Sequence, residues 1–262
     1  MDTWWNTGPD SISCMDPVPL SRVYCPASQR VDDWEQCRAL LDDVGAASWI
    51  TGGHGVPNVT LLPTMWRGSL LLAHAAAHNL QFDLPEATPV PCRVVVQGPH
   101  TYVTPRWYPS VQPPDLGGSA RGRAEFRGVG TWDYTQVQVA GWLRVHRDRD
   151  RLRTEVMDQA EQLDAARLVE TPHVGDAVRG PWNRDEAPHD FTDAMLQGIV
   201  GLELEITDVV GRFKVSRNRT AVDRDGVVQG LRERGRDRDH RVADEVAAAP
   251  PLPRGVQGPS TP

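Results

Sequence analysis

The sequence predicts a mainly β protein with appended helices, an α+β fold built around a small β-barrel. Two observations support this fold class. Several strand-like segments follow one another in hairpin order, and helical segments are added around them. The sequence contains no repeating strand–helix–strand unit, which argues against a parallel sheet. It also contains no internal repeat.

The first predicted element is a helix that Asp32 or Asp33 can cap and that ends near Gly45. Its apolar residues recur at intervals of three and four positions, as one face of a helix requires. They are Trp34, Cys37, Leu40, Leu41 and Val44. We expect an amphipathic helix of about three turns.

Strand-like segments dominate the next hundred residues. Each strand shows an alternating or continuous apolar pattern. Breaks that contain Gly or Pro indicate where it begins and ends. The expected strands are residues 47–51, 56–63 (after a Gly-Gly-His-Gly turn), 68–74, 92–97 and 131–145, with a short helix or turn at residues 75–80.

The second half alternates between helices and strands. Charged residues with helical spacing of apolar ones predict a helix over residues 148–168. Phe191, Met195 and Ile199 indicate a short helix that stops at Gly201. The remaining expected elements are a strand at 202–207, its hairpin partner at 212–216 across residues 209–211, and a final helix at 222–232. The mixed-sign run at 232–241 is interpreted as a solvated face.

We therefore divide the chain into an N-terminal tail (1–21), a barrel domain with helical additions (22–232) and a charged, Pro-rich C-terminal tail (233–262). The net charge of −7 argues against a protein that grips DNA along a basic face. No apolar run approaches the roughly 20 residues of a membrane span, and the first residues lack a secretion signal. We expect a cytoplasmic protein.

Few short motifs point to chemistry. The Gly-rich nucleotide loops, the Gly-x-Ser-x-Gly elbow and the His-Glu-x-x-His metal helix are all absent from the sequence. The four cysteines are spaced too widely for paired metal ligation and are expected to be free thiols: Cys14, Cys25, Cys37 and Cys92. Lys214 is the single lysine among 28 basic residues.

Two imidazoles, His74 and His78, stand four residues apart beyond a buried strand. A neutral imidazole at the end of an apolar strand, flanked by small residues, is what an axial haem ligand requires. A histidine that only forms a hydrogen bond at the strand end is the simpler interpretation of the spacing.

Aromatic and cationic segments form a second group of candidates. Residues 98–109 combine four aromatic or imidazole rings with three prolines, which can hold rings for stacking on a planar ligand. Residues 131–134 form a similar cluster. Residues 212–219 offer an ammonium, a hydroxyl, an amide and guanidinium groups for a phosphate or carboxylate. Core packing and a charged hairpin edge explain these segments equally well.

An ordered series of motifs resembles the PaiB-like branch of the flavin-binding split-barrel proteins, over roughly residues 22–232. The series comprises residues 23–26, 68–79, 98–109, 131–134, 198–201 and 213–218. The resemblance implies a split β-barrel that forms a homodimer, with its ligand at the subunit interface. Some members of this branch are FMN-binding negative transcriptional regulators. The related piperazate synthases bind haem and join two nitrogens.

The chain departs from the pattern of these proteins in three places. Relatives often have His-Leu-Pro where this chain has residues 61–63 (Leu-Leu-Pro), and an arginine where it has Ala76 or Ala77. Arg67 and Arg93 are the only lysine or arginine residues between positions 39 and 96. Two cations are few for binding an FMN phosphate, which usually takes several donors. The Gly- and Arg-rich insertion at 111–130 reads as a loop that could act as a lid.

The leading hypothesis is a haem b enzyme of specialised metabolism, of the kind used in antibiotic biosynthesis, that forms an N–N bond from a hydroxylamine-type substrate and an amine. The resemblance makes His74 the axial metal ligand. Lys214 and Tyr102 are the catalytic candidates. The cofactor-binding candidates are His74, His78, Trp107, Trp132, Tyr134, Ser216 and Asn218.

Two alternatives stay open. In the first, the chain is an FMN-binding regulator or flavin reductase in which Lys214, Ser216 and Asn218 contact the cofactor and His74 is structural. The sequence offers no recognisable helix-turn-helix, so nucleic acid is not an expected partner. In the second alternative the barrel is empty and serves as a binding module.

Overall fold

The computed structural model describes residues 23–52, 55–86, 88–113, 126, 128–170 and 180–250. The predicted N-terminal tail, Cys14 and most of the 111–130 insertion lie outside these residues. The described chain forms two compact units. The barrel unit contains residues 38–96 and 138–209, and the extension unit contains residues 23–37, 97–137 and 210–250.

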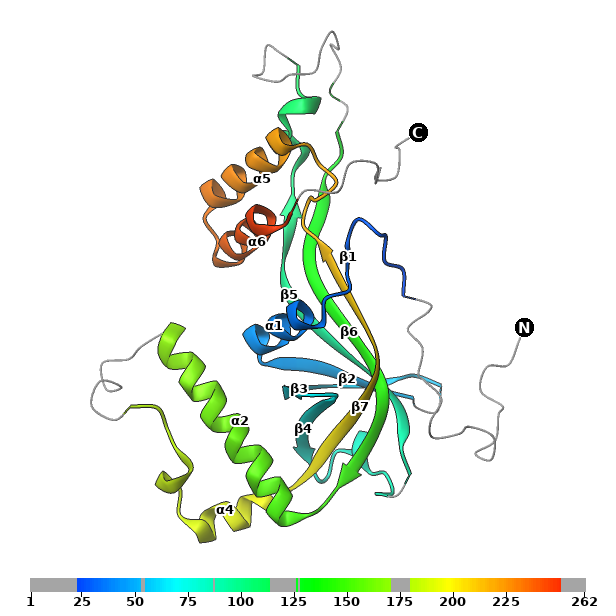
Figure 1. Cartoon of the computed structure of the whole chain (residues 1–262), viewed down its shortest axis with the longest axis vertical. Coiled ribbons are helices and arrows are strands. Elements are labelled where there is room, and N and C mark those ends of the chain that lie inside the picture. Colours follow the sequence, from blue (N-terminus) through cyan, green and yellow to red (C-terminus); the bar gives the residue numbers. More distant parts are fainter. Residues whose placement is uncertain are drawn as a thin grey trace. The chain divides into compact units, whose positions relative to one another are not determined.

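Seven antiparallel strands form one sheet in the order β1-β7-β4-β3-β2-β5-β6, and β6 also pairs with β7 (Figure 1). The second pairing closes six strands into a ring, so the expected barrel in a mainly β protein with appended helices is confirmed. The strands are β1 Arg30–Val31, β2 Ala46–Thr51, β3 Asn58–Arg67, β4 Leu70–Ala76, β5 Val90–Val103, β6 Thr131–His146 and β7 Ile199–Lys214.

Five described α-helices and several 3₁₀ turns are appended to this sheet. The described α-helices are α1 Trp34–Val44, α2 Arg149–Glu170, α4 His189–Leu196, α5 Ala221–Arg234 and α6 Asp237–Ala248. The 3₁₀ turns are η1 Leu80–Phe82, η2 Pro105–Trp107, η3 Pro109–Val111 and η5 Arg184–Glu186. In the described part of the chain, no helix is both long and apolar enough to cross a membrane.

The core of the barrel unit follows from side-chain alternation along its strands. The cross-strand pairs Ala73–Leu202 and Ala75–Val200 point inward, and their side chains are buried. Trp49 is fully buried as well, and its indole N–H donates to the Thr64 hydroxyl at 2.9 Å. Each fully buried large apolar side chain contributes roughly 1.5–3 kcal/mol to folding.

The extension unit closes around a pair of helices. α5 and α6 lie side by side (Figure 1), and Gly235 joins them in the left-handed conformation with φ of 69°. Arg234 donates to both oxygens of the buried Asp239 at 2.6 Å and to the Thr101 hydroxyl of β5 at 2.8 Å. The pair of helices is thereby attached to β5.

Several element predictions are wrong in detail. β4 begins at Leu70, because Gly68 with φ of 59° forms the turn before it, and β4 continues through Ala76 where a short helix or turn was expected to begin at Ala75; the turn follows at residues 77–78. β7 runs unbroken from Ile199 to Lys214 instead of forming a hairpin. Residues 209–211 (Val-Val-Gly) lack a turn-forming pair, and their β-branched side chains favour a continuous strand.

The structure also differs from the expected C-terminal tail. Residues 237–248 form α6, because Val242, Ala243 and Val246 are buried on one helix face that the surrounding charges concealed in the sequence. Residues 251–262 lie outside the described chain. The described cysteines Cys25, Cys37 and Cys92 are free, as expected.

Candidate functional site

The ends of β5, β6 and β7 in the extension unit present polar and aromatic side chains on one side of the sheet. Along β6, Trp132 and Tyr134 point outward while Asp133 and Thr135 are buried, as strand alternation requires. Trp132 is 47% exposed, an unusual state for so large an apolar side chain. We call the outward set Gln97, His100, Trp132, Tyr134 and Gln136 the aromatic face.

A cavity of about 240 Å³ is lined by these five residues. Trp132 Nε1 donates to His100 Nδ1 at 3.2 Å, and the two rings are 5.8 Å apart with a tilt of 32°. Gln136 Nε2 donates to Gln97 Oε1 at 3.1 Å. Rings and amides are therefore fixed against each other beside this hollow.

Two cations border the aromatic face. The guanidinium of Arg212 lies 5.3 Å from the ring centres of both Tyr24 and Tyr134 and donates to Gln29 Oε1 at 3.0 Å. Lys214 Nζ donates to the Thr131 hydroxyl and, at 2.6 Å, to the main-chain oxygen of Trp132.

Neither of these cations forms an ion pair with a described carboxylate, and both hold neutral acceptors only. Burial lowers the pKa of Lys214, Asp133 opposes that effect, and Arg212 and Arg219 add to it. The positive charge at this edge is thus available to an anionic ligand group.

Beneath the aromatic face, on the inner side of β6, lies a cluster of buried polar groups. The Ser216 hydroxyl donates to Asp133 Oδ2 at 2.6 Å, and both residues are buried. Tyr108 is fully buried and Arg219 lies 4.3 Å from its ring centre. Burial raises the pKa of Asp133 to about 6, against the opposing effects of Ser216, Lys214 and Arg219.

Four of the predicted site residues therefore lie at or next to the aromatic face: Lys214, Trp132, Tyr134 and Ser216. Ser216 faces the inner side, so its hydroxyl is held by Asp133 and does not point to the aromatic face. Asn218 is exposed. Tyr102 is 45% exposed and lies against Gly130, where a Cβ atom would come within 2.0 Å of the Tyr102 hydroxyl.

Trp107, also predicted to bind a cofactor, packs against α5. A Cβ atom at Gly230 would come within 2.3 Å of its indole ring, and the guanidinium of Arg234 lies 5.0 Å from the ring centre. The missing side chain at Gly230 is what admits the indole. These contacts give Trp107 a packing role in the extension unit.

The predicted metal ligand His74 belongs to the barrel unit, where it is half-buried on the outer side of β4 and pairs with Gly201 of β7. Burial lowers the pKa of His74, and Glu155 opposes that effect. His78 is exposed in the turn after β4. Because β4 extends through Ala76, the two imidazoles do not share a helix face.

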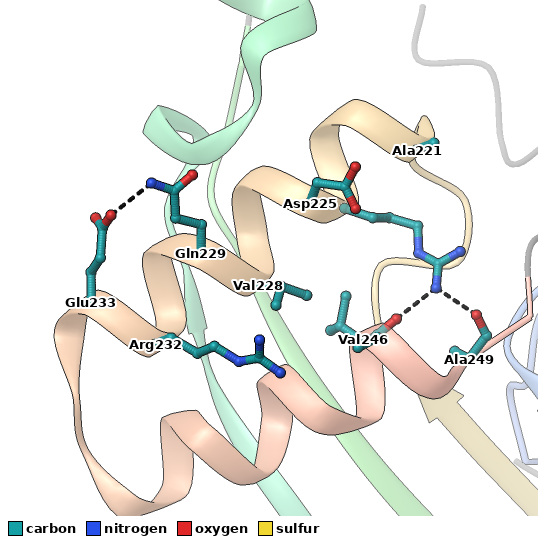
Figure 2. A pocket seen from close by; sticks show the side chains of 10 residues that line it. Ala221, Asp225, Val228, Gln229, Arg232, Glu233, Val246 and Ala249 are labelled. Carbon is teal, nitrogen blue, oxygen red and sulfur yellow. Dashed lines mark hydrogen bonds between the residues drawn. The ribbon is translucent and has the colours of Figure 1, made fainter.

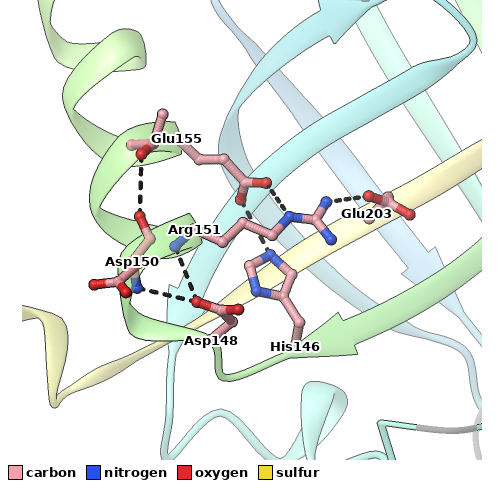
Figure 3. A network of polar contacts seen from close by, with 7 residues as sticks. His146, Asp148, Asp150, Arg151, Glu155 and Glu203 are labelled. Carbon is pink, nitrogen blue, oxygen red and sulfur yellow. Dashed lines mark hydrogen bonds and ion pairs between the residues drawn. The ribbon is translucent and has the colours of Figure 1, made fainter.

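A polar network on the same barrel unit was not predicted (Figure 3). His146 Nε2 lies 3.1 Å from Glu155 Oε2, and Arg151 Nε donates to Glu155 Oε1 at 2.7 Å and pairs with Glu203. A Cβ atom at Gly201 would come within 2.1 Å of His146 Nε2, so the imidazole fills the space that the glycine leaves. Among the described residues, His146 Nδ1 is buried without a hydrogen-bond partner.

A groove of about 830 Å³ lies between α5 and α6 (Figure 2). Its apolar lining includes Val228 and Val246. Arg224 donates to the main-chain oxygens of Val246 and Ala249, which caps the end of α6, and Gln229 donates to Glu233 at 2.7 Å. The groove shares no lining residue with the aromatic face.

Sequence reasoning missed Gln97 and Gln136 as parts of the site, and it placed His100, Asp133 and Arg212 only within the candidate segments 98–109, 131–134 and 212–219 without naming them as site residues. The first three come together only because β5 and β6 are neighbours in the sheet. Asp133 could have been noticed, because a carboxyl group at an inward position of an alternating strand needs a partner.

A closed antiparallel barrel with appended helices and an aromatic face agrees with the flavin-binding split-barrel class that the sequence resembles. Residues 23–208 match the family described as "Putative FMN-binding domain". The chain belongs to this family.

Curated relatives include an uncharacterised protein of Aspergillus fumigatus, 30% identical over 58% of this chain and 56% of the relative. An uncharacterised protein of Emericella nidulans is also 30% identical, over 58% of this chain and 57% of the relative. The chain thus spans little more than half of these fungal relatives. The protease synthase and sporulation protein PAI 2 of Bacillus subtilis is 24% identical over 80% of this chain and 89% of that protein.

Similar solved structures include a FAD and haem binding protein from Mycobacterium smegmatis, with 16% identity, 71% and 73% of the two chains covered, and a TM-score of 0.46. The flavocytochrome Anf3 from Azotobacter vinelandii has 16% identity, 89% and 88% coverage, and a TM-score of 0.45.

Proposed function

We propose that the chain binds FMN at the aromatic face and acts as a flavin-dependent reductase. The observation that carries this proposal is the cavity beside Trp132 and Tyr134, with Arg212 and Lys214 at its edge. Membership of the FMN-binding family supports the choice of cofactor.

The residues fit the chemistry of FMN in three respects. Trp132 and Tyr134 offer ring surface for the planar isoalloxazine, since offset stacking of aromatic systems is favourable. The amides of Gln97 and Gln136 suit the hydrogen-bonding edge of the flavin ring. Lys214 and Arg212 supply positive charge for the phosphate. Residues 39–96 contain only two arginines and no lysine that could do so.

Bound flavin supplies hydride and electron transfer. The chain's own residues bind and orient it: Trp132 and Tyr134 cover ring surface, and Lys214 holds an anionic group. Tyr102, the second predicted catalytic residue, stands on β5 close to this face and would border the substrate.

FMN binding is tested by titrating the purified protein and following quenching of flavin fluorescence. We expect Trp132→Ala to weaken binding by about tenfold or more, since stacking of this kind is worth about 1–3 kcal/mol per ring. Trp34→Ala is the matched control, because Trp34 of α1 is 45% exposed and lies outside the aromatic face. Equal affinity in both variants would reject this site, and specific retention of an operator-like DNA by the flavin-loaded protein would favour the regulator instead.

The resemblance to split-barrel dimers leads us to propose a homodimer as well. Light scattering of the eluted protein across a dilution series measures the mass directly. A mass near 58 kDa, about twice that of the 29.0 kDa chain, is expected, and a monomer at all concentrations would reject the dimer.

A haem-dependent enzyme that joins a hydroxylamine-type nitrogen to an amine is the second candidate, and one observation favours it. His74 is half-buried, burial lowers its pKa so that the neutral imidazole is favoured, and no hydrogen bond from its ring to another described residue is present. A neutral imidazole of this kind suits an axial iron ligand.

The surroundings of His74 fit a haem less well. The space in front of Gly201, which pairs with His74, holds the imidazole of His146, and that ring is tied to Glu155 and Arg151. A charged network does not suit an apolar macrocycle, so we derive no reaction step from haem. Absorption spectra of the haem-reconstituted wild type, His74→Ala and the control His78→Ala decide the matter: a Soret band lost only in His74→Ala would favour this candidate.

A further inference from the structure

β7 and the turn that follows it hold β6 on both sides of the sheet. On the outer side, Lys214 Nζ donates to the main-chain oxygen of Trp132 at 2.6 Å. On the inner side, Ser216 donates its hydroxyl to Asp133 at 2.6 Å. Because Trp132 and Asp133 are neighbours in sequence, the two contacts fix opposite faces of one dipeptide.

We propose that Asp133 is a positioning residue for the aromatic face, which acts through Ser216 to hold Lys214 in place. The inference rests on the proposed function, since it names a residue that regulates the same site. Asp133 itself is 1% exposed.

The backbone of Ser216 adopts an unfavourable conformation at this contact. Ser216 has φ of 54°, and it is the one non-glycine residue with positive φ in the described chain. This conformation costs roughly 1–2 kcal/mol in residues with a Cβ atom. The hydrogen bond to Asp133 offsets that cost, and Lys214 lies two residues before the turn.

Among the described residues, the charged groups that act on Asp133 belong to the same cluster. Lys214 of β7 and Arg219, which precedes α5, act on its carboxyl group, and Asp133 in turn acts on the buried Tyr108 between η2 and η3. Tyr108 has a buried hydroxyl group without a hydrogen-bond partner among the described residues. The negative charge of ionised Asp133 therefore interacts with the ammonium group of Lys214. The Asp133 carboxyl group, with a pKa of about 6, loses this charge as pH falls through that value.

The single lysine makes this coupling measurable without a ligand. In protein labelled with [13C]lysine, the Cε resonance belongs to Lys214 alone. We expect this resonance to show an inflection near about pH 6 in the wild type, where Asp133 titrates. The inflection should vanish in Asp133→Asn, whose amide oxygen can still accept from Ser216, and persist in the control Asp239→Asn, which alters a buried carboxylate bonded to Arg234.

Affinity for FMN tests the positioning role. Ser216→Gly removes the hydroxyl and suits a backbone with positive φ, so it separates the hydrogen bond from the strain. We expect Ser216→Gly and Asp133→Ala to bind FMN about tenfold more weakly at pH 7, and Asp133→Asn to stay within about twofold of the wild type.

The outcomes separate this proposal from the proposed function. A flat Lys214 titration between pH 5 and 7, or wild-type affinity in Ser216→Gly, would overturn the role of Asp133 even if FMN binds. Failure of the wild type to bind FMN would overturn the proposed function, while the Cε titration would still decide whether Asp133 and Lys214 are coupled. Should Asp133→Ala not fold, Ser216→Gly and Asp133→Asn still give the answer.

Discussion

His146 lies in the space that Gly201 leaves open, so that a Cβ atom at position 201 would come within 2.1 Å of the imidazole Nε2. The contact joins neighbouring strands of the barrel unit, β6 and β7. It also places His146 beside the glycine that pairs with His74. The imidazole is held there by Glu155 from α2.

The first prediction follows from this contact. Gly201→Ala should lower the free energy of unfolding by about 1–3 kcal/mol, because the added methyl group overlaps a ring that Glu155 holds in place. Urea denaturation measures the change. Gly198→Ala is the control, since a Cβ atom there would meet only a main-chain oxygen at 3.6 Å. If His146→Ala does not reduce the cost of Gly201→Ala in a double-mutant cycle, the overlap is not its cause.

The second prediction concerns stability and pH. Burial raises the pKa of Asp133 to about 6 from an ordinary 3.8. The folded state therefore binds the proton more tightly, and the associated stability is fully present below about pH 4 and lost as pH rises through 6. The wild type should lose on the order of 3 kcal/mol of folding free energy in this way. Asp133→Asn has no ionisable group at this position and should not show the loss.

Thermal unfolding of Asp133→Asn and the wild type at pH 5 and pH 8 tests that sign. Asp133→Asn is expected to gain stability relative to the wild type as pH rises from 5 to 8. A constant difference between the two proteins across this range would contradict it.

Glu155 gives the third prediction, with the opposite sign. Burial acts to raise its pKa, but hydrogen bonds from His146 and Arg151 outweigh burial and leave the pKa lowered. Its stabilising effect is present above its ordinary value of 4.5 and is lost as pH falls through the lowered pKa. Glu155→Gln should therefore destabilise the protein at pH 7 and have less effect at pH 3, as followed by circular dichroism. Asp148→Asn, an exposed change nearby, serves for comparison.

The fourth prediction separates packing from cofactor binding at Trp107. Its half-buried indole fits against Gly230 of α5, so Trp107→Ala should destabilise the extension unit by about 1–3 kcal/mol. FMN affinity of the protein that remains folded should stay within about twofold of the wild type, because Trp107 is not part of the aromatic face. A large loss of affinity at unchanged stability would return Trp107 to the cofactor site.

The sequence predicted the barrel because alternation along a strand is a local signal. The 131–145 segment shows it plainly, and the structure extends that strand by only one residue, to His146. Continuity of β7 was missed because a glycine at position 211 resembles a turn, while pairing with β1 is what keeps the strand extended there. α6 was missed since its few buried residues stand among charges.

The candidate site was predictable only in part, for a similar reason. Lys214 and Trp132 are chemically conspicuous in the sequence, whereas the pairing of Trp132 with His100 depends on strands that are 32 residues apart along the chain. The buried contact between Ser216 and Asp133 spans 83 residues. No local sequence pattern indicates which residues meet across such separations along the chain. These contacts form only when the segments become neighbours in the folded sheet.

The bond between Thr101 and Asp239 bears on how fragments of this protein should be made. The family match ends at residue 208, yet Asp239 accepts at 2.7 Å from the hydroxyl of Thr101, which lies within the match. A fragment trimmed to the matched residues would leave that threonine without its partner and would remove α5, against which Trp107 packs. Expressed fragments that keep these contacts should therefore extend at least to Pro250, and a homologous protein that ends earlier must fill this gap with other residues.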